Sequence, residues 1–406
     1  MYTFRQYCIA ALLLTGILFF SGCLAPDFFL SGKTGTNDII RIAAVLPLSG
    51  KNRVFAEQMR EGLQMAVHEL NANSRNGKKA VILRTFDSKG SADGTAAALK
   101  EVKKWNAAGI IAGYSTDEVS SIIANAANLR MPIVMPLATS DRHSEISPYV
   151  YRTCYTNSQQ AEMLAAYLWY WRTAKHLGIF TGENEEAEYQ TAITRGTAES
   201  FQTLGGSITT VISLPGELSD KDVSAMLKSD PEAILLTFGG KKAALAIRKL
   251  RSLGFTGIIC GADNWNTAEL IDALDNFKVG DCLYTALFAD DDSVAEYRNF
   301  KTAFRKRFYH NPGACETQCY DALKFLVFSL RNTGTLPGFD KNWRKIRNLH
   351  GAAACYTMLP KGGIDRTIYI NSIGVRRNGQ KIEPFARLSK KLQYSKLQEY
   401  KPEYYE

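Results

Sequence analysis

The chain has 406 residues, of which 46% are hydrophobic and 22% charged, and its formal net charge is +9. That length is enough for two domains with full cores, and the composition is that of an ordinary globular protein, which excludes a disordered or fibrous chain. The basic residues are scattered. Their one cluster, Arg298 to Arg307, is interleaved with phenylalanines and is typical of the solvated face of an amphipathic helix. No nucleic-acid-recognition motif occurs, so we expect no nucleic acid partner.

The first 22 residues differ in composition from the rest of the chain. Arg5 precedes an apolar run from Ile9 to Phe20, and small residues follow that run. A basic start, a short apolar core and small residues before a cleavage point are typical of a secretory signal peptide, and the run is too short to span a bilayer comfortably. We therefore predict a signal peptide over residues 1–22 and an exported protein.

The end of this segment resembles a lipidation motif. Phe20 to Cys23 read Phe-Ser-Gly-Cys, similar to the bacterial lipobox, in which the cysteine carries a lipid and becomes the first residue of the mature protein. Phe20 stands where that motif usually has Leu, Val or Ile, and the alternative is a cysteine placed there by chance. We predict that Cys23 is lipidated and that residues 23–38, which contain Pro, Gly and polar residues, tether the protein to the membrane.

The spacing of cysteines and histidines indicates no metal site. Once Cys8 leaves with the signal peptide and Cys23 is lipidated, the remaining cysteines are Cys154, Cys260, Cys282, Cys315, Cys319 and Cys355. In an exported chain they permit disulfides, but the sequence does not assign a pairing. No Cys-x-x-Cys motif occurs and the five histidines show no ligand spacing, so we expect neither a metal nor a cofactor.

The globular part is predicted to begin with a strand buried on both faces, because residues 39–46 form an almost continuous apolar run. Pro47 to Gly50 then turn the chain into a helix. Its apolar stripe consists of Phe55, Met59, Leu63, Ala66 and Leu70. A strand over residues 80–86 and a helix over residues 94–107 follow, and this alternation argues for a parallel sheet.

Residues 109–139 read as strand, turn, helix, strand and turn. Apolar runs at 109–113 and 131–135 flank a segment, 117–129, that has apolar residues at helical spacing. Such a unit implies two parallel strands with the helix on one face, as in a doubly wound sheet. Because ligands bind beyond the carboxyl ends of such strands, the turns at 114–116 and 137–139 should face one crevice.

These two turns supply candidate ligand-binding residues, which are Ser115, Thr116, Leu137, Ala138 and Thr139. Hydroxyls and free amides at a helix start suit an anion such as a carboxylate. Each hydroxyl also has a structural alternative: Ser115 and Glu118 match a capping box, and Thr139 could be only a turn residue. Capping and binding are compatible for Ser115, because a capped helix still points free amides at an anion.

A second set of alternating elements predicts a second parallel sheet. Strands are expected at residues 175–180, 207–213, 233–238 and 257–261, and helices at residues 159–171, 189–204, 222–228 and 241–253. Ser158 is the candidate cap of the first of these helices. Further helices at 294–308 and 317–331 and a late strand at 367–372 complete the predicted elements.

Several short blocks, in their order, resemble one known family. The blocks are Arg41–Gly50, Glu61-Gly62, Ala66–Asn71, Pro136–Thr139, Tyr149–Thr153, Gln160-Ala161 and Tyr320–Ala322. Together they are similar to the bacterial type I solute-binding proteins, and above all to the leucine/isoleucine/valine-binding family of ABC transporters. No single block is specific, but their order and spacing are, and the resemblance covers residues 39–385.

The resemblance implies an α/β fold with two doubly wound parallel-sheet lobes, joined by a hinge that the chain crosses three times. The first lobe would comprise residues 39–157 and 288–355, and the second lobe residues 158–287 and 356–385. Residues 386–406 form a charged C-terminal tail without an assigned role.

The resemblance also implies a binding residue in the second lobe. Asp263 follows the strand at 257–261, where the family places the carboxylate that receives a ligand's α-ammonium, although family members often have the longer Glu. The structural alternative is helix capping. Asn266 with Glu269 is the better capping pair, however, which frees Asp263 for a ligand.

Three aromatic residues are further candidates. Tyr189 matches the tyrosine that opens the first helix of the family's second lobe, and Phe55 matches an aromatic position at the pocket rim. The alternatives are an exposed tyrosine at a helix start and a phenylalanine that begins the core stripe of its own helix. Trp265, close to Asp263 in sequence, is a candidate to cover the ligand's side chain.

These residues together suit a zwitterion. The turns of the first lobe would bind a carboxylate and Asp263 an ammonium, so that the ligand bridges both lobes and favours the closed form. No nucleophile motif, metalloprotease motif or phosphate loop occurs, so we expect no enzyme.

The function implied is that of a lipid-anchored, monomeric solute-binding protein at the periplasm or cell surface. It would deliver an amino acid or a similar small polar solute to the membrane permease of an ABC transporter. The alternative is an envelope lipoprotein of the same fold that senses or regulates cell-wall synthesis through protein contacts, because the fold alone does not decide function.

Overall fold

The computed structural model describes residues 39–396, except 73–79, 142–146, 183–186, 332 and 379–380. The predicted signal peptide, Cys23 and the tether lie outside the described residues, as does the end of the predicted tail from residue 397. In the part that the structure describes, no helix combines the length and the apolar character that a membrane span requires.

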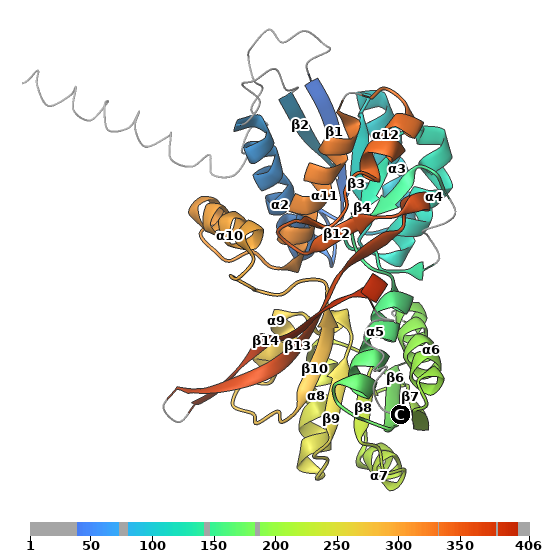
Figure 1. Ribbon diagram of the computed structural model, residues 1–406, viewed down its shortest axis with the longest axis vertical. Helices are drawn as coiled ribbons and strands as arrows, with labels where there is room; N and C mark the ends of the chain where they lie inside the picture. The colour runs from blue at the N-terminus through green and yellow to red at the C-terminus, as the bar shows by residue number, and fades with distance from the viewer. Residues whose placement is uncertain are drawn as a thin grey trace, which may run out of the picture. The chain divides into compact units, whose positions relative to one another are not determined.

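The first sheet has five strands in the order β2-β1-β3-β4-β5 (Figure 1). They are β1 (Ile39–Leu46), β2 (Ala80–Asp87), β3 (Gly109–Ala112), β4 (Ile133–Met135) and β5 (Val150–Arg152). β1 pairs with β3, β3 with β4 and β4 with β5, all in parallel. Every residue of β3, β4 and β5 is buried, as expected of strands covered by helices on both faces.

Among the described residues, the helices that accompany this sheet are α2 (Arg53–Ala72), α3 (Ala92–Trp105), α4 (Thr116–Leu129), α10 (Ala295–Phe308), α11 (Ala314–Leu330) and α12 (Leu336–Trp343). α2 and α11 are distant in sequence but pack at very close range at Gly62. A Cβ atom on Gly62 would lie 2.0 Å from the carbonyl oxygen of Glu316, so only glycine fits there. α11, which follows β5 after a long stretch of chain, thus packs on a helix of the first sheet.

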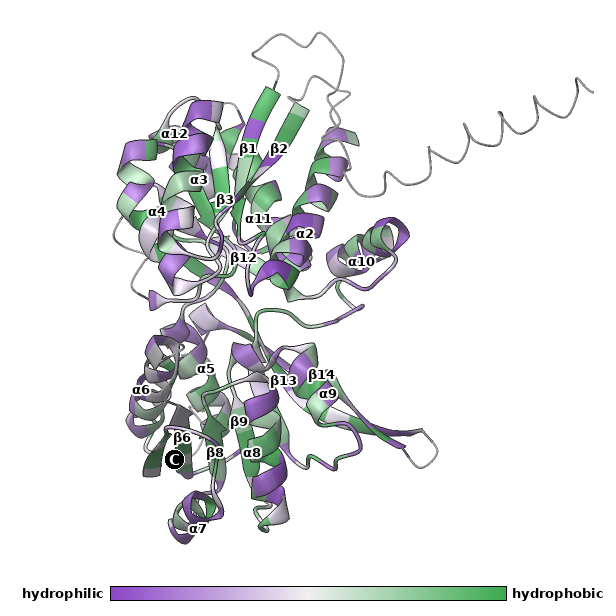
Figure 2. Ribbon diagram, turned by 180° about the vertical axis from the view of Figure 1, so that it is seen from behind, coloured by the Kyte–Doolittle hydropathy of each residue, from purple (hydrophilic) through white to green (hydrophobic). Residues whose placement is uncertain are grey.

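The second sheet is larger and mixed, with its strands in the order β11-β12-β13-β10-β9-β8-β6-β7 and β14 paired to β13. Its parallel part consists of β6 (His176–Gly182), β7 (Ser207–Leu214), β8 (Ala233–Leu236), β9 (Ile258–Gly261) and β10 (Cys282–Ala286). Its helices are α5 (Asn157–Tyr170), α6 (Ala187–Thr203), α7 (Asp220–Lys228), α8 (Gly240–Ser252) and α9 (Ala268–Ala273). Figure 2 shows the hydrophobic colour along β8 and β9 and both colours on the helices.

The C-terminal part of the sheet is longer than the sequence predicts. β13 spans Ile364–Asn378 and is antiparallel to its three partners, β12 (Cys355–Met358), β10 and β14 (Lys381–Gln393). β11 (Leu349–His350) pairs with β12 at the edge. Residue 385, where the sequence suggested that the second lobe ends, therefore lies inside β14. Most residues of β14 are at least partly exposed, so no apolar run marks the strand.

Two predicted helix caps are wrong, although the helices are correct. Thr156, not Ser158, caps α5, and its hydroxyl accepts a hydrogen bond from Gln159 N at 3.1 Å. Thr267, not Asn266, caps α9 and accepts from Leu270 N at 3.3 Å. In both places two hydroxyl or amide residues stand within two positions of each other, and the backbone geometry decides between them.

The cysteines whose pairing the sequence left open are thiols in this structure. Cys154, Cys260, Cys282 and Cys319 are buried, and Cys315 and Cys355 are partly buried. Burial raises the pKa of the Cys154 thiol to about 11, even though two arginines nearby favour the thiolate. These thiols therefore behave as small apolar side chains.

Candidate functional site

The turn after β3 is a rigid start for α4. The Ser115 hydroxyl accepts a hydrogen bond from Glu118 N at 3.4 Å, and the Glu118 carboxylate accepts from Ser115 N at 2.9 Å. This reciprocal pair is the predicted capping box, so the structural interpretation of Ser115 is confirmed. The Glu118 carboxylate is buried and also accepts from the Ser88 hydroxyl after β2, which joins two strand ends.

Phe55 lies over this turn. Its ring stacks on that of Tyr114, with ring centroids 5.2 Å apart and an interplanar angle of 25°. Phe55 is half-buried, whereas the next residue, Ala56, is fully buried on the core face of α2. The structure therefore brings Phe55 to the turn at 114–116.

The second predicted turn follows β4, which neighbours β3 in the sheet. Ala138 is buried in the core of the first lobe, so it offers only backbone groups to a ligand, while Leu137 and Thr139 are partly exposed. The carbonyl oxygen of Thr139 accepts from Asn157 N at 2.7 Å, at the start of α5. The turn is thus bonded directly to the first helix of the second sheet.

On the second sheet, three elements converge on Asp263. The residue follows β9 and opens the short helix η2 (Asp263–Trp265). Tyr189 at the start of α6 donates its hydroxyl hydrogen to the Asp263 carboxylate, which unites two residues that are distant in sequence. Gln160 of α5 accepts from Asp263 N at 3.3 Å and from the Thr285 hydroxyl at 2.9 Å.

The two groups of candidate residues are therefore linked through α5. Asn157, which bonds to Thr139, and Gln160, which bonds to Asp263, are separated by one helical turn. Burial raises the pKa of the Asp263 carboxyl, although hydrogen bonds from Tyr189 and Gln160 oppose this shift. Sequence reasoning missed Gln160 as a site residue. The available signal was the Gln160-Ala161 block of the family resemblance, and the structure shows that Gln160 is fully buried.

Trp265 does not belong to this site. Its side chain is fully buried, its indole N–H donates to the carbonyl oxygen of Phe238 at 3.0 Å, and its ring packs near that of Tyr284. Gly261 lies against the same ring, where a Cβ atom would come within 2.1 Å of it. η2 turns the indole inward, so the prediction that Trp265 covers a ligand is wrong.

A sequence profile of the periplasmic binding protein family matches residues 39–363. The chain belongs to this family. Membership indicates an exported protein and confirms the resemblance drawn from the sequence. β13 and β14 both lie entirely beyond the matched residues.

Relatives of this periplasmic binding protein support the same assignment. The Leu/Ile/Val-binding protein BraC3 of Rhizobium johnstonii is 29% identical over 240 residues, which cover 57% of this chain and 63% of that protein. The match thus spans less than two thirds of the relative's length.

Solved structures share the fold. The leucine-binding protein LivK of Thermotoga maritima has a TM-score of 0.70 at 23% identity, covering 87% of this chain and 98% of that one. The substrate-binding protein LivJ of Streptococcus pneumoniae, solved with isoleucine, has a TM-score of 0.70 at 19% identity, covering 86% and 99%. These likenesses confirm the predicted fold of two α/β lobes.

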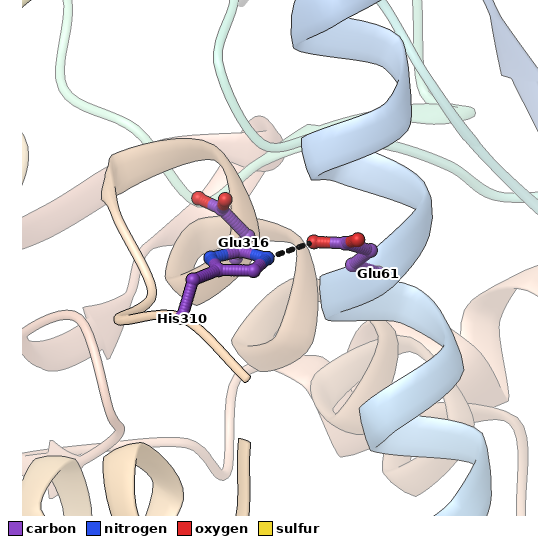
Figure 3. Close-up of side chains that lie close together, drawn as sticks. All are labelled: Glu61, His310 and Glu316. Carbon is purple, nitrogen blue, oxygen red and sulfur yellow. Dashed lines mark hydrogen bonds and ion pairs between the residues drawn. The ribbon is translucent and has the colours of Figure 1, made fainter. Parts of the chain in front are cut away.

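The first lobe of this periplasmic binding protein also contains a cluster of potential metal ligands that the spacing of histidines did not reveal (Figure 3). His310 Nε2 lies 2.9 Å from Glu61 Oε2, its Nδ1 lies 3.0 Å from the Asn311 carbonyl oxygen, and Glu316 is adjacent. Burial opposes protonation of the ring, but Asn311 and Glu61 raise the pKa of His310. Both ring nitrogens already face acceptors, so an ion pair between α2 and the loop before α11 accounts for these contacts.

Replacing Ser115 by alanine should destabilise the protein by about 1 kcal/mol, because α4 loses its capping hydroxyl. Ser219→Ala is the matched control, since Ser219 forms the same capping box with Asp222 on α7, away from the candidate site. Urea denaturation should show similar losses for both variants. Only Ser115→Ala should also weaken ligand binding in calorimetry, and unchanged binding would leave Ser115 with capping alone.

Proposed function

We propose that this protein binds a zwitterionic amino acid between its lobes, a branched-chain amino acid in the first place. The observation that carries the proposal is the environment of Asp263. Its carboxylate is desolvated and has a phenol and amides as partners, and none of the described cationic side chains forms an ion pair with it. A ligand ammonium would supply the missing positive charge.

The ligand carboxylate would bind at the first lobe. The start of α4 offers the amides of Thr116 and Asp117 and the positive end of the helix dipole, next to the Ser115 and Thr139 hydroxyls. Phe55, stacked on Tyr114, would lie beside the same turn. A ligand held at both ends favours the closed arrangement, because the open one offers only half of these contacts.

The names of the relatives support this class of ligand and imply a partner. The Rhizobium protein is a Leu/Ile/Val-binding protein, and the Streptococcus structure is that of a branched-chain amino acid transporter component with isoleucine bound. We infer that the present protein delivers its solute to the permease of an ABC importer, without catalysis and as a monomer.

Calorimetric titration with L-leucine and two truncated analogues tests the proposal. 3-Methylbutylamine lacks the carboxylate and 4-methylpentanoate lacks the ammonium, so each should bind on the order of tenfold or more weakly than leucine. Leucine at 100 times its dissociation constant should add about 2.7 kcal/mol to the free energy of unfolding, which a thermal-shift assay detects as a higher melting temperature. If no L-amino acid raises the melting temperature, or if 4-methylpentanoate binds as well as leucine, the proposed function is wrong.

We further propose that Cys23 carries the lipid that holds the protein at the membrane. Cys23→Ser should move the mature protein from the membrane fraction to the soluble fraction of the cell envelope, because one thiol is the attachment point. Fractionation and immunoblotting of both forms measure this. A Cys23→Ser variant that is processed and still sediments with membranes would contradict the proposal.

A further inference from the structure

In the part of the chain that the structure describes, three segments connect the lobes, and one buried arginine contacts all of them. The segments are residues 153–156 between β5 and α5, residues 287–294 between β10 and α10, and the first residues of β13. Arg366 lies on β13, where its side chain is 1% exposed. Its position between the lobes follows from the pairing of β13, which contacts β12 at residues 364–366 and β10 at residues 369–372.

The guanidinium of Arg366 donates to a backbone carbonyl of each of the other two segments. Nη1 donates to the Thr153 carbonyl oxygen at 2.9 Å, and Nη2 to the Leu287 carbonyl oxygen at 2.5 Å. Nη1 also donates to Gln318 Oε1 at 2.8 Å. Gln318, buried on α11, donates in turn to the Leu287 carbonyl oxygen at 2.7 Å. A single side chain thus joins all three connections to the body of the first lobe.

The chemistry of this contact suits a joint that moves. Arginine presents several donors in one rigid plane, whereas a carbonyl oxygen accepts hydrogen bonds over a broad range of directions. The rings of Tyr155 and Tyr356 lie 5.7 and 5.2 Å from the guanidinium carbon, and none of the described carboxylates forms an ion pair with it. Each carbonyl group can therefore change its direction while its oxygen stays hydrogen-bonded to the guanidinium.

We propose that Arg366 is a positioning residue that couples the three connections, so that they bend as one unit when the lobes move. The effect of this coupling on ligand affinity rests on the proposed function, but the coupling itself is a property of the ligand-free protein. Lysine at this position keeps the charge and most of the aliphatic stem. Its single nitrogen cannot hold both segments in the geometry of the guanidinium plane.

Hydrogen exchange measured by mass spectrometry on the ligand-free mature protein tests the coupling. In Arg366→Lys, amides in all three connections should exchange on the order of tenfold faster or more, while β3 and β8 remain protected. Thermal unfolding should broaden or split, because the lobes no longer unfold together.

Arg251→Lys is the matched control. Arg251 also donates to backbone carbonyls, those of Phe255, Gly257, Val279 and Asp281, but all of them belong to the second sheet and its loops. This variant should lose stability without faster exchange in the connections. If Arg366→Lys gives the same exchange pattern as Arg251→Lys, Arg366 is only structural and the proposal is overturned.

Gln318→Met provides a second variant should Arg366→Lys fail to fold. It removes one bond to Arg366 and one to Leu287, so exchange should rise in the same three segments, and an unchanged pattern would again overturn the proposal. A thermal-shift screen of the wild type with the L-amino acids separates the two hypotheses. If no L-amino acid binds while the exchange effects are intact, the proposed function is refuted and the coupling stays in place.

Discussion

Replacing Asp263 by asparagine should make the ligand-free protein more stable and a poor binder. Burial raises the pKa of Asp263 above its ordinary value, so the folded state holds this proton more tightly than the unfolded state does. The ionised carboxylate therefore costs stability at pH values above the raised pKa, and the cost disappears as the pH falls through it. Asparagine removes the charge but keeps an oxygen that accepts from the Tyr189 hydroxyl.

Affinity should change in the opposite direction. When the ligand's ammonium has no carboxylate partner in a desolvated site, the binding free energy weakens by roughly 2–5 kcal/mol. This corresponds to a loss of about 30-fold or more in affinity for L-leucine. For the same reason, wild-type affinity should fall as the pH decreases through the raised pKa of Asp263. Calorimetry at several pH values and urea denaturation without ligand measure both effects.

Asp272→Asn is the control for this prediction, because Asp272 is an exposed carboxylate on α9 and should matter to neither measurement. Equal leucine affinities in wild type and Asp263→Asn would exclude Asp263 from the site. A variant that loses both stability and affinity would show that the carboxylate is structural.

Replacing Asp321 by alanine should cause one of the largest losses of stability available in this fold. The buried Asp321 carboxylate on α11 accepts from Ala352 N at 2.8 Å, Ala353 N at 2.7 Å and the Tyr356 hydroxyl at 3.0 Å. Alanine leaves these donors unpaired in the interior, where each costs about 1–3 kcal/mol. The total loss should be about 3 kcal/mol or more in urea denaturation.

A pH series adds a second signature of Asp321. Burial raises the pKa of its carboxyl to about 6, against hydrogen bonds that favour ionisation. Wild-type stability should therefore gain a contribution from this group as the pH falls from 7 to 5, and Asp321→Ala should lack it. Asp220→Ala, which removes an exposed ion pair with Lys249, should cost less than about 1 kcal/mol. Equal losses in the two variants would contradict the buried-carboxylate argument.

The parts of the molecule that follow local rules were predictable from the sequence. The apolar runs of β1, β3 and β8 predict strands buried on both faces, and the pair Ser115 and Glu118 predicts the cap of α4. Both patterns can be recognised because each is complete within a few residues. Only the family resemblance named both Tyr189 and Asp263 as candidate site residues, since no local pattern connects the two residues that are hydrogen-bonded in the structure.

Other features depend on contacts between distant residues and left no pattern to read. In the sequence, Arg366 cannot be distinguished from other polar strand residues. Only the folded chain brings it into hydrogen-bonding contact with Thr153, Leu287 and Gln318. Trp265 was misassigned because sequence proximity to a site does not fix which way a side chain points. β14 was missed because a strand paired on one side and open on the other needs no continuous apolar run.

The hairpin of β13 and β14 also has a mechanical consequence. Gln393, at the end of β14, pairs with Thr367, the residue after Arg366, while the far end of the ladder pairs Lys381 with Asn378. A force applied to the chain beyond Gln393 therefore enters the molecule beside the joint between its lobes. Such a force would break the hydrogen bonds between β14 and β13 one pair after another, starting with the pair of Gln393 and Thr367. A surface anchor or reporter placed at this end would pull on the moving part of the protein, whereas one placed on α7 would leave it undisturbed.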